Sequence, residues 1–213
     1  MVQIAPSMLA ADFLNLGKDV ELVNAYADIF HLDIMDGTFV PNISYGFPVV
    51  ESIARAARKP MDAHLMIIHP EKYVERFAAA GVRMLSFHLN AAENPGDVLS
   101  QIRSCGMMAG LAINPDIPVE DLFPYLDKCD YIVIMSVFAG FGGQKFIEDT
   151  YQRVAALKAE IDRRGLKCHI QVDGGVSASN SAKLTAVGAD ILVAGSAVFK
   201  SDDPAAVIAA MRG

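Results

Sequence analysis

A repeating unit of an apolar run, an amphipathic segment and a glycine extends through this chain. The apolar, β-rich runs predict strands at residues 2–6, 29–35, 61–66, 84–88, 109–113, 131–137, 169–172 and 191–194. Helical patterns follow at residues 12–26, 47–58, 70–80, 95–105, 118–126, 149–164, 179–187 and 204–212. Gly81, Gly106, Gly165 and Gly188 each stand just past a helical segment, where a left-handed residue ends a helix. The repeat predicts an α/β protein with parallel strands.

Eight such units can close into a (β/α)8 barrel or form an open, doubly wound sheet. The nucleotide-binding form of the open sheet carries GxGxxG after its first strand, whereas this chain has Ser7-Met8-Leu9-Ala10-Ala11 there. No change of composition divides the 213 residues. We therefore predict a (β/α)8 TIM barrel in which residues 1–213 form a single catalytic domain.

The charge and cysteine content restrict the possible partners and surroundings. A net charge of −7 and a pI near 5.1 argue against nucleic acid or an anionic membrane as partner. The three cysteines show no CxxC spacing, which indicates reduced thiols and a cytoplasmic protein. Neither a signal peptide nor a bilayer-spanning apolar segment is expected. The apolar segment 205–211 predicts a homo-oligomer.

His31 and Asp33 share one face of an expected strand, because alternate residues of a strand point the same way. Such a pair is often only a hydrogen-bonded structural pair, but imidazole and carboxylate also bind divalent metals. Two further strands end in the same kind of side chain, at His64 and Asp173. In a barrel these strand ends surround one mouth, where the chemistry collects.

Two imidazoles and two carboxylates can hold a catalytic cation and leave room for substrate oxygens. Carboxylates also exchange protons, so Asp33 and Asp173 on opposite sides of a substrate can act as two bases. One would remove a proton from a carbon and the other would return a proton to the opposite face. The carbon must lie beside a carbonyl, and a cation would stabilise the resulting enediolate. This pattern predicts stereochemical inversion next to a ketone.

Glycine-rich loops follow three consecutive strands, in the region where such barrels usually hold phosphate. They are residues 140–143, 174–175 and 195–196. One such loop is more often a simple turn, but three together predict that backbone N–H groups hold a phosphate. The two longest connections, 36–46 and 138–148, lie on the same face and are expected to act as lids.

The strings HLDIMDGTFVPN (31–42), DAHLM (62–66), GFGGQKF (140–146), VDGGV (172–176) and GS (195–196) resemble the ribulose-phosphate 3-epimerases. The resemblance implies interconversion of D-ribulose 5-phosphate and D-xylulose 5-phosphate in the pentose phosphate pathway. It implies one divalent metal ion per subunit, with His31, Asp33, His64 and Asp173 as ligands. Zinc, iron(II), manganese and cobalt all suit this ligand set. By the same resemblance, Asp33 accepts the proton and Asp173 donates it.

The resemblance also implies a set of substrate-binding residues. These are Ser7 and His64 on the sugar, Met35, Met66 and Met135 around the mouth, and Gly140, Phe141, Gly142, Gly143, Gly174, Gly175, Gly195 and Ser196 at the phosphate. The methionines are also ordinary core fillers. We assign His88 to the surroundings of the metal rather than to its ligands. The chain departs from the family pattern at Phe138-Ala139, where a proline usually stands, and at Asn90, where a glutamate is common.

Three other functions are compatible with parts of this pattern. A 3-epimerase of a ketohexose 6-phosphate, such as D-allulose 6-phosphate, would share the metal, the bases and the phosphate loops. A phosphate-binding barrel decarboxylase would need a catalytic lysine in a DxKxxD string, which this chain lacks. A non-catalytic sugar-phosphate binding protein would bind the substrate without exchanging its hydrogen with solvent.

Overall fold

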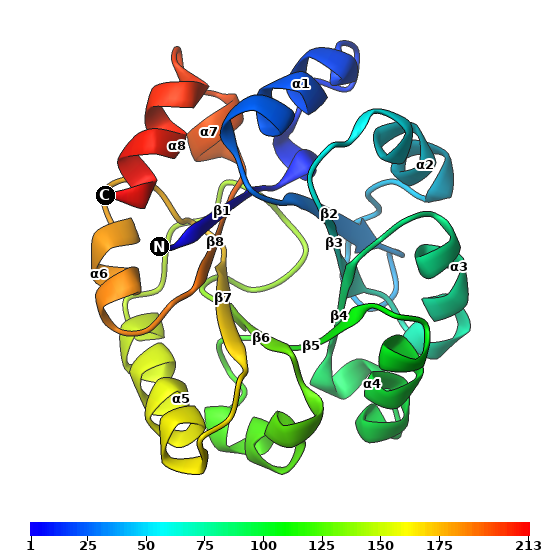
Figure 1. Ribbon diagram of the computed structural model, residues 1–213, viewed down its shortest axis with the longest axis vertical. Helices are drawn as coiled ribbons and strands as arrows, with labels where there is room; N and C mark the ends of the chain where they lie inside the picture. Colours follow the sequence, from blue (N-terminus) through cyan, green and yellow to red (C-terminus); the bar gives the residue numbers. More distant parts are fainter.

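The computed structural model describes residues 1–213 and contains one sheet of eight parallel strands. The strands are β1 Gln3–Pro6, β2 Phe30–Met35, β3 Met61–Met66, β4 Met84–His88, β5 Met108–Ile113, β6 Tyr131–Met135, β7 His169–Asp173 and β8 Ile191–Ala194. Their order is β1-β8-β7-β6-β5-β4-β3-β2, and a bridge between Ser7 and His31 joins the two end strands. The sheet thus closes into a ring inside a ring of helices (Figure 1). The predicted TIM barrel and its eight strands are confirmed.

The connections contain eight α-helices and four 3₁₀ helices. The α-helices are α1 Leu16–Tyr26, α2 Phe47–Ala56, α3 Val74–Ala79, α4 Pro95–Ser104, α5 Thr150–Arg164, α6 Ser181–Ala186, α7 Ser196–Phe199 and α8 Pro204–Arg212. The 3₁₀ helices are η1 Met8–Ala10, η2 Pro70–Lys72, η3 Leu89–Ala91 and η4 Val119–Lys128. None of the helices combines the length and apolarity needed to cross a bilayer.

Two of the helices expected from the sequence differ in the structure. The segment predicted at 118–126 is the 3₁₀ helix η4. Pro124 lies in its middle, and in an α-helix the proline ring would clash with the carbonyl four residues earlier. The segment predicted at 70–80 divides at Tyr73 into η2 and α3, and the first turn is closed by the short-range bond from Tyr73 N to Pro70 O. The short helix α7 was not predicted.

The apolar residues of the strands form two main cores, and Met35 and Met66 at the ends of β2 and β3 join Val40 in a small third cluster. Along β6, Ile132 and Ile134 join the large cluster between the barrel and its helices, whereas Tyr131, Val133 and Met135 join a smaller cluster inside the barrel. This alternation is the two-residue period of a strand. The barrel interior is therefore a packed core, and the site lies on top of it.

Helix α8 bears on the expectation of a homo-oligomer, which was based on the apolar segment 205–211. Its Ile208 and Met211 are almost fully buried and belong to the large core cluster. The largest apolar side chains of this segment are thus used within the subunit. The oligomeric state stays a prediction.

Gly110 on β5 offers a test of the interior packing. A Cβ atom at this position would lie 2.4 Å from Cζ of Tyr131 and 2.8 Å from Cβ of Ser86. Because both neighbours are fully buried, we expect Gly110→Ala to lower the free energy of unfolding by about 1–3 kcal/mol, measured by urea denaturation. In the control Gly17→Ala, the new Cβ meets nothing within 4 Å, and stability should stay equal or rise. Equal stability of both variants would contradict the packing described here.

Candidate metal and substrate site

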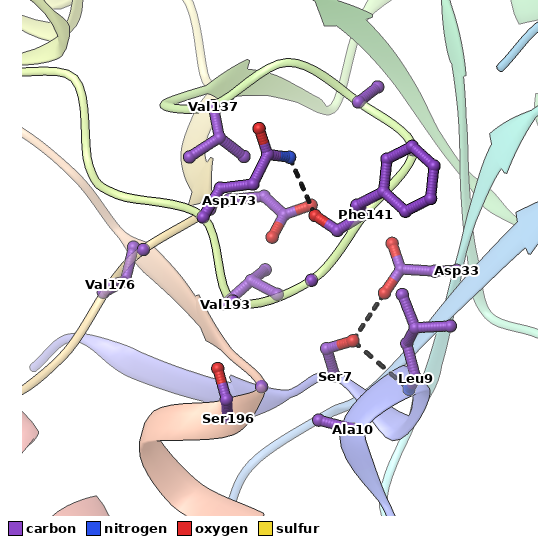
Figure 2. Close-up of a pocket in the computed structure, with 18 of the residues that line it drawn as sticks. Ser7, Leu9, Ala10, Asp33, Val137, Phe141, Asp173, Val176, Val193 and Ser196 are labelled. Atoms are coloured by element: carbon purple, nitrogen blue, oxygen red, sulfur yellow. Dashed lines mark hydrogen bonds between the residues drawn. The ribbon is translucent and has the colours of Figure 1, made fainter. Parts of the chain in front are cut away.

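Strand order brings four metal-capable side chains to the carboxyl end of the barrel. His31 and Asp33 lie on β2, His64 on β3 and Asp173 at the end of β7. The register of β2 and β3 places Asp33 beside His64. Asp33 and Asp173 reach the pocket from opposite sides (Figure 2). The sequence-predicted ligand residues are therefore close neighbours in space.

The separations between these side chains suit one shared cation. Nε2 of His31 lies 3.4 Å from Oδ1 of Asp33 and 3.7 Å from Oδ2 of Asp173. Nδ1 of His64 lies 3.5 Å from each of the same two oxygens. A tetrahedral site with ligand bonds of about 2.1 Å places neighbouring ligand atoms about 3.4 Å apart. One donor atom from each residue lies within 4.8 Å of all the others, so the four can hold a metal ion.

Each histidine turns one nitrogen toward the cluster and the other toward a buried partner. Nε2 of His31 and Nδ1 of His64 are buried and have no hydrogen-bond partner in the protein. Nδ1 of His31 lies 2.9 Å from Oδ2 of Asp62, and Nε2 of His64 lies 3.0 Å from Nε2 of His88. A buried polar atom without a partner is costly, and a cation would satisfy both nitrogens. The donor set therefore fits a divalent metal.

Charge in this cluster shifts the protonation of its members. Burial opposes the charged form of His31, but the carboxylates of Asp33 and Asp62 outweigh burial and hold the pKa of His31 well above its usual value. The pKa of His64 is also raised, because Asp173 and Asp33 outweigh its burial. The pKa of Asp33 is lowered, since the two imidazoles overcome the effect of its burial. Without a cation, imidazolium protons thus balance the charge of the carboxylates.

A pocket of about 710 Å³ opens above the cluster. The sequence-predicted residues that line it are Ser7, Asp33, Met35, Met66, Met135, Gly140, Phe141, Gly142, Gly143, Asp173, Gly174, Gly175, Gly195 and Ser196. His31 and His64 are fully buried and lie behind this lining. Ser7 donates a hydrogen bond from its hydroxyl to Oδ2 of Asp33, which fixes one carboxylate against β1 (Figure 2).

The two longest loops meet over the pocket. Nδ2 of Asn42 in the β2–α2 loop donates to the carbonyl of Gly140 in the β6–α5 loop, at 2.7 Å. Gln144 donates to the carbonyls of Phe138 and Phe141, and so closes the glycine-rich segment on itself. The Phe141 side chain extends over the pocket and is half exposed. Side-chain amides therefore hold the roof of the pocket.

Gly174 and Gly175 follow Asp173 in backbone conformations that other residues rarely adopt, with φ of 114° and 62°. A Cβ on Gly174 would lie 2.4 Å from Cγ2 of Val137, and one on Gly175 would lie 2.7 Å from the backbone nitrogen of Phe146. The two glycines thus let the chain turn sharply after Asp173 and run close to the β6–α5 loop.

Comparison with known proteins agrees with this geometry. The sequence model of the ribulose-phosphate 3 epimerase family matches residues 3–199. A ribulose-phosphate 3-epimerase from Synechocystis is 45% identical, over 99% of this chain and 93% of its own. The enzyme of that name from Mycobacterium bovis is 43% identical, over 98% of this chain and 91% of its own. The one from Escherichia coli is 42% identical, over 98% of this chain and 94% of its own. The chain belongs to the ribulose-phosphate 3-epimerase family.

The protein is thus an enzyme of an epimerase family, as its motifs predicted. Solved structures of much lower identity share the fold alone. A mutant tryptophan synthase alpha-subunit from Pyrococcus furiosus matches with a TM-score of 0.73 at 16% identity, over 99% of this chain and 96% of its own. KGPDC from Streptococcus mutans matches with a TM-score of 0.72 at 12% identity, over 100% of this chain and 96% of its own.

The sequence analysis did not assign several residues to the site that the structure places around it. Asp62, Asn42 and Gln144 all contact predicted site residues or the loops that carry them. A signal existed for Asp62, because it stands two residues before His64 and so shares its face of β3. Asn42 and Gln144 lie in loops, where spacing does not predict a partner.

Cation binding should release protons, because Nε2 of His31 must lose its proton before it can act as a ligand. The raised pKa of His31 keeps this imidazole protonated at neutral pH in the metal-free protein. We therefore expect metal affinity to fall as the pH is lowered, by about tenfold per pH unit for each proton displaced. Calorimetric titration with Zn²⁺ in buffers of different ionisation enthalpy measures the number released. Binding heats independent of the buffer would contradict this protonation state.

Proposed function

We propose that this protein inverts C3 of a ketose phosphate and interconverts D-ribulose 5-phosphate and D-xylulose 5-phosphate, with residues 1–213 acting as one catalytic domain. The observation that carries the proposal is the pair of carboxylates, Asp33 and Asp173, on opposite sides of one pocket (Figure 2). Family membership supports the substrate, since the curated relatives carry that activity in their names.

In the proposed chemistry, one proton leaves one face of a carbon and another proton adds to the opposite face. The Asp33 carboxylate removes the C3 proton of D-ribulose 5-phosphate, and the electrons of that bond delocalise toward the C2 carbonyl as a 2,3-enediolate. Asp173 acts as the acid and gives a proton to the opposite face of C3, which restores the carbonyl with inverted configuration. The lowered pKa of Asp33 agrees with a group that begins ionised.

The cluster of His31, Asp33, His64 and Asp173 is proposed to hold one divalent cation. When bound, a cation supplies positive charge beside the substrate oxygens, which stabilises the negative charge that develops there. The protein keeps its donor groups in place through Ser7, which hydrogen-bonds Asp33, and through Asp62 and His88, which contact the two histidines.

The phosphate is proposed to lie at the other end of the pocket, against Gly174, Gly175, Gly195 and Ser196. Gly195 precedes the first turn of α7, where backbone N–H groups lack helical partners. Such groups bind anions without a cationic side chain. This supports a phosphorylated substrate for a chain of net charge −7.

Removal of bound metal should abolish epimerisation of D-ribulose 5-phosphate. Dialysis against a chelator, followed by a coupled assay for D-xylulose 5-phosphate, measures the loss. Addition of Zn²⁺, Mn²⁺, Co²⁺ or Fe²⁺ should restore the rate, because each of these ions accepts imidazole and carboxylate ligands. Full activity of metal-free protein would refute the cation-dependent mechanism.

The same assay distinguishes the pentose from the hexose substrate. We expect kcat/KM for D-ribulose 5-phosphate to exceed that for D-allulose 6-phosphate. Faster turnover of the hexose phosphate would reassign the enzyme to the longer sugar. Binding of either sugar without incorporation of solvent deuterium at C3 would indicate a binding protein.

Asp173→Asn should lower kcat by about 10²–10⁴-fold at saturating metal, because an amide keeps the shape but carries no exchangeable carboxyl proton. Asp33 remains in this variant. We therefore expect the C3 hydrogen of D-ribulose 5-phosphate to exchange with D₂O, followed by NMR, while D-xylulose 5-phosphate no longer forms. A loss of less than tenfold in kcat would show that Asp173 is not a proton carrier.

A further inference from the structure

Asp62 lies in the barrel interior directly below the proposed metal ligands and is fully buried. Three side chains from three other strands contact its carboxyl group. Nδ1 of His31 lies 2.9 Å from Oδ2, Nε2 of Gln171 donates to the same oxygen at 2.7 Å, and the hydroxyl of Tyr131 donates to Oδ1 at 2.7 Å. No cationic lysine or arginine is among these partners. A buried carboxylate is thus satisfied by neutral donors and by one imidazole.

The contacts of Asp62 determine which nitrogen of His31 carries a proton. When a cation binds, Nε2 of His31 gives up its proton, and the ring proton that stays is the one on Nδ1, which lies 2.9 Å from Oδ2 of Asp62 and can donate to it. Nε2 then offers its lone pair on the side of Asp33 and Asp173. A histidine that binds a metal through one nitrogen commonly donates from the other to a carboxylate, which makes the ligand nitrogen more basic.

The packing around Tyr131 keeps its hydroxyl in contact with the carboxyl group of Asp62. The ring lies inside the barrel because Gly110 on the neighbouring strand leaves space for it. From there its hydroxyl reaches Asp62, while Gln171 approaches from β7. The orientation of the carboxylate is therefore fixed from two sides independently of His31.

The two proposed histidine ligands differ in the group that their second ring nitrogen contacts. His64 contacts the imidazole of His88, whereas His31 contacts a carboxylate. The carboxylate places a negative charge beside one ligand only. A purely structural role would not require a charge at this position, since an amide could make the same hydrogen bonds.

We propose that Asp62 is a positioning residue that fixes the tautomer of His31 and strengthens its binding to the cation through its negative charge. The proposal rests on the proposed function, because it needs the metal site. It assigns a role in the reaction to a residue that touches neither the substrate nor the cation.

Asp62→Asn isolates the charge of this residue. The amide nitrogen can face Tyr131, whose hydroxyl can turn and accept, so the amide oxygen keeps the bonds from His31 and Gln171. Asp190→Asn is the matched control. Its carboxylate also contacts a histidine, His169, at 3.6 Å, but it precedes β8 at the opposite end of the barrel.

The experiment measures the dissociation constant of Co²⁺ for each purified apoprotein, by competition with a coloured chelator below the melting temperature of each variant. We expect Asp62→Asn to raise the dissociation constant by about 10–100-fold, and Asp190→Asn to leave it close to that of the wild type. Tyr131→Phe, which removes one hydrogen bond from the carboxylate, should raise it by a smaller factor. It also replaces Asp62→Asn if that variant does not fold.

The outcomes separate this inference from the proposed function. If the wild type binds no Co²⁺, the metal site itself is refuted, and the role of Asp62 falls with it. If the wild type binds Co²⁺, and the variants at Asp62 and Tyr131 that fold bind it with the same dissociation constant as the wild type, only the positioning role is refuted. An equal weakening in Asp190→Asn would assign the effect to a general loss of stability and would also overturn the proposal.

Discussion

Closure of the sheet between β1 and β2 is the constraint on which the site depends. In the hydrogen-bonded order of the strands, β1 and β2 are the two ends, and β7 lies near the β1 end. An open sheet would therefore hold Asp33 and Asp173 far apart. The bridge from Ser7 to His31 joins the ends at the level of the site, and the Ser7 hydroxyl bonds Asp33. The contact that closes the barrel thus also helps to assemble the site.

The sequence predicted the parts of this structure that follow from local patterns. Eight apolar runs became eight strands, and the two-residue period placed His31 and Asp33 on one face of β2. The contact between His31 and Asp62 could not be predicted, because it depends on the register between β2 and β3. Likewise, the pattern at 118–126 favoured an α-helix, and the single Pro124 turned it into a 3₁₀ helix.

An acidic protein that takes an anionic substrate must provide positive potential locally. The chain carries a net charge of −7, yet the pocket is lined on one side by glycine-rich loops with backbone N–H groups. On the other side lies a donor cluster suited to a divalent cation. Backbone N–H groups and a bound cation would each supply positive potential over short distances, so neither requires a basic surface.

The proposed reacting groups lie on strands and the groups above the pocket lie on loops, so the site can combine fixed geometry with access for a ligand. The groups proposed to bind the cation and move protons lie on strands, and a buried layer of Asp62, Tyr131 and Gln171 supports them from below. The groups above the pocket lie on loops, and the hydrogen bond from Asn42 to Gly140 joins two of these loops. Breaking such a loop contact leaves the strand hydrogen bonds intact. The contact between the loops can therefore change without moving the strands that carry the groups proposed to react.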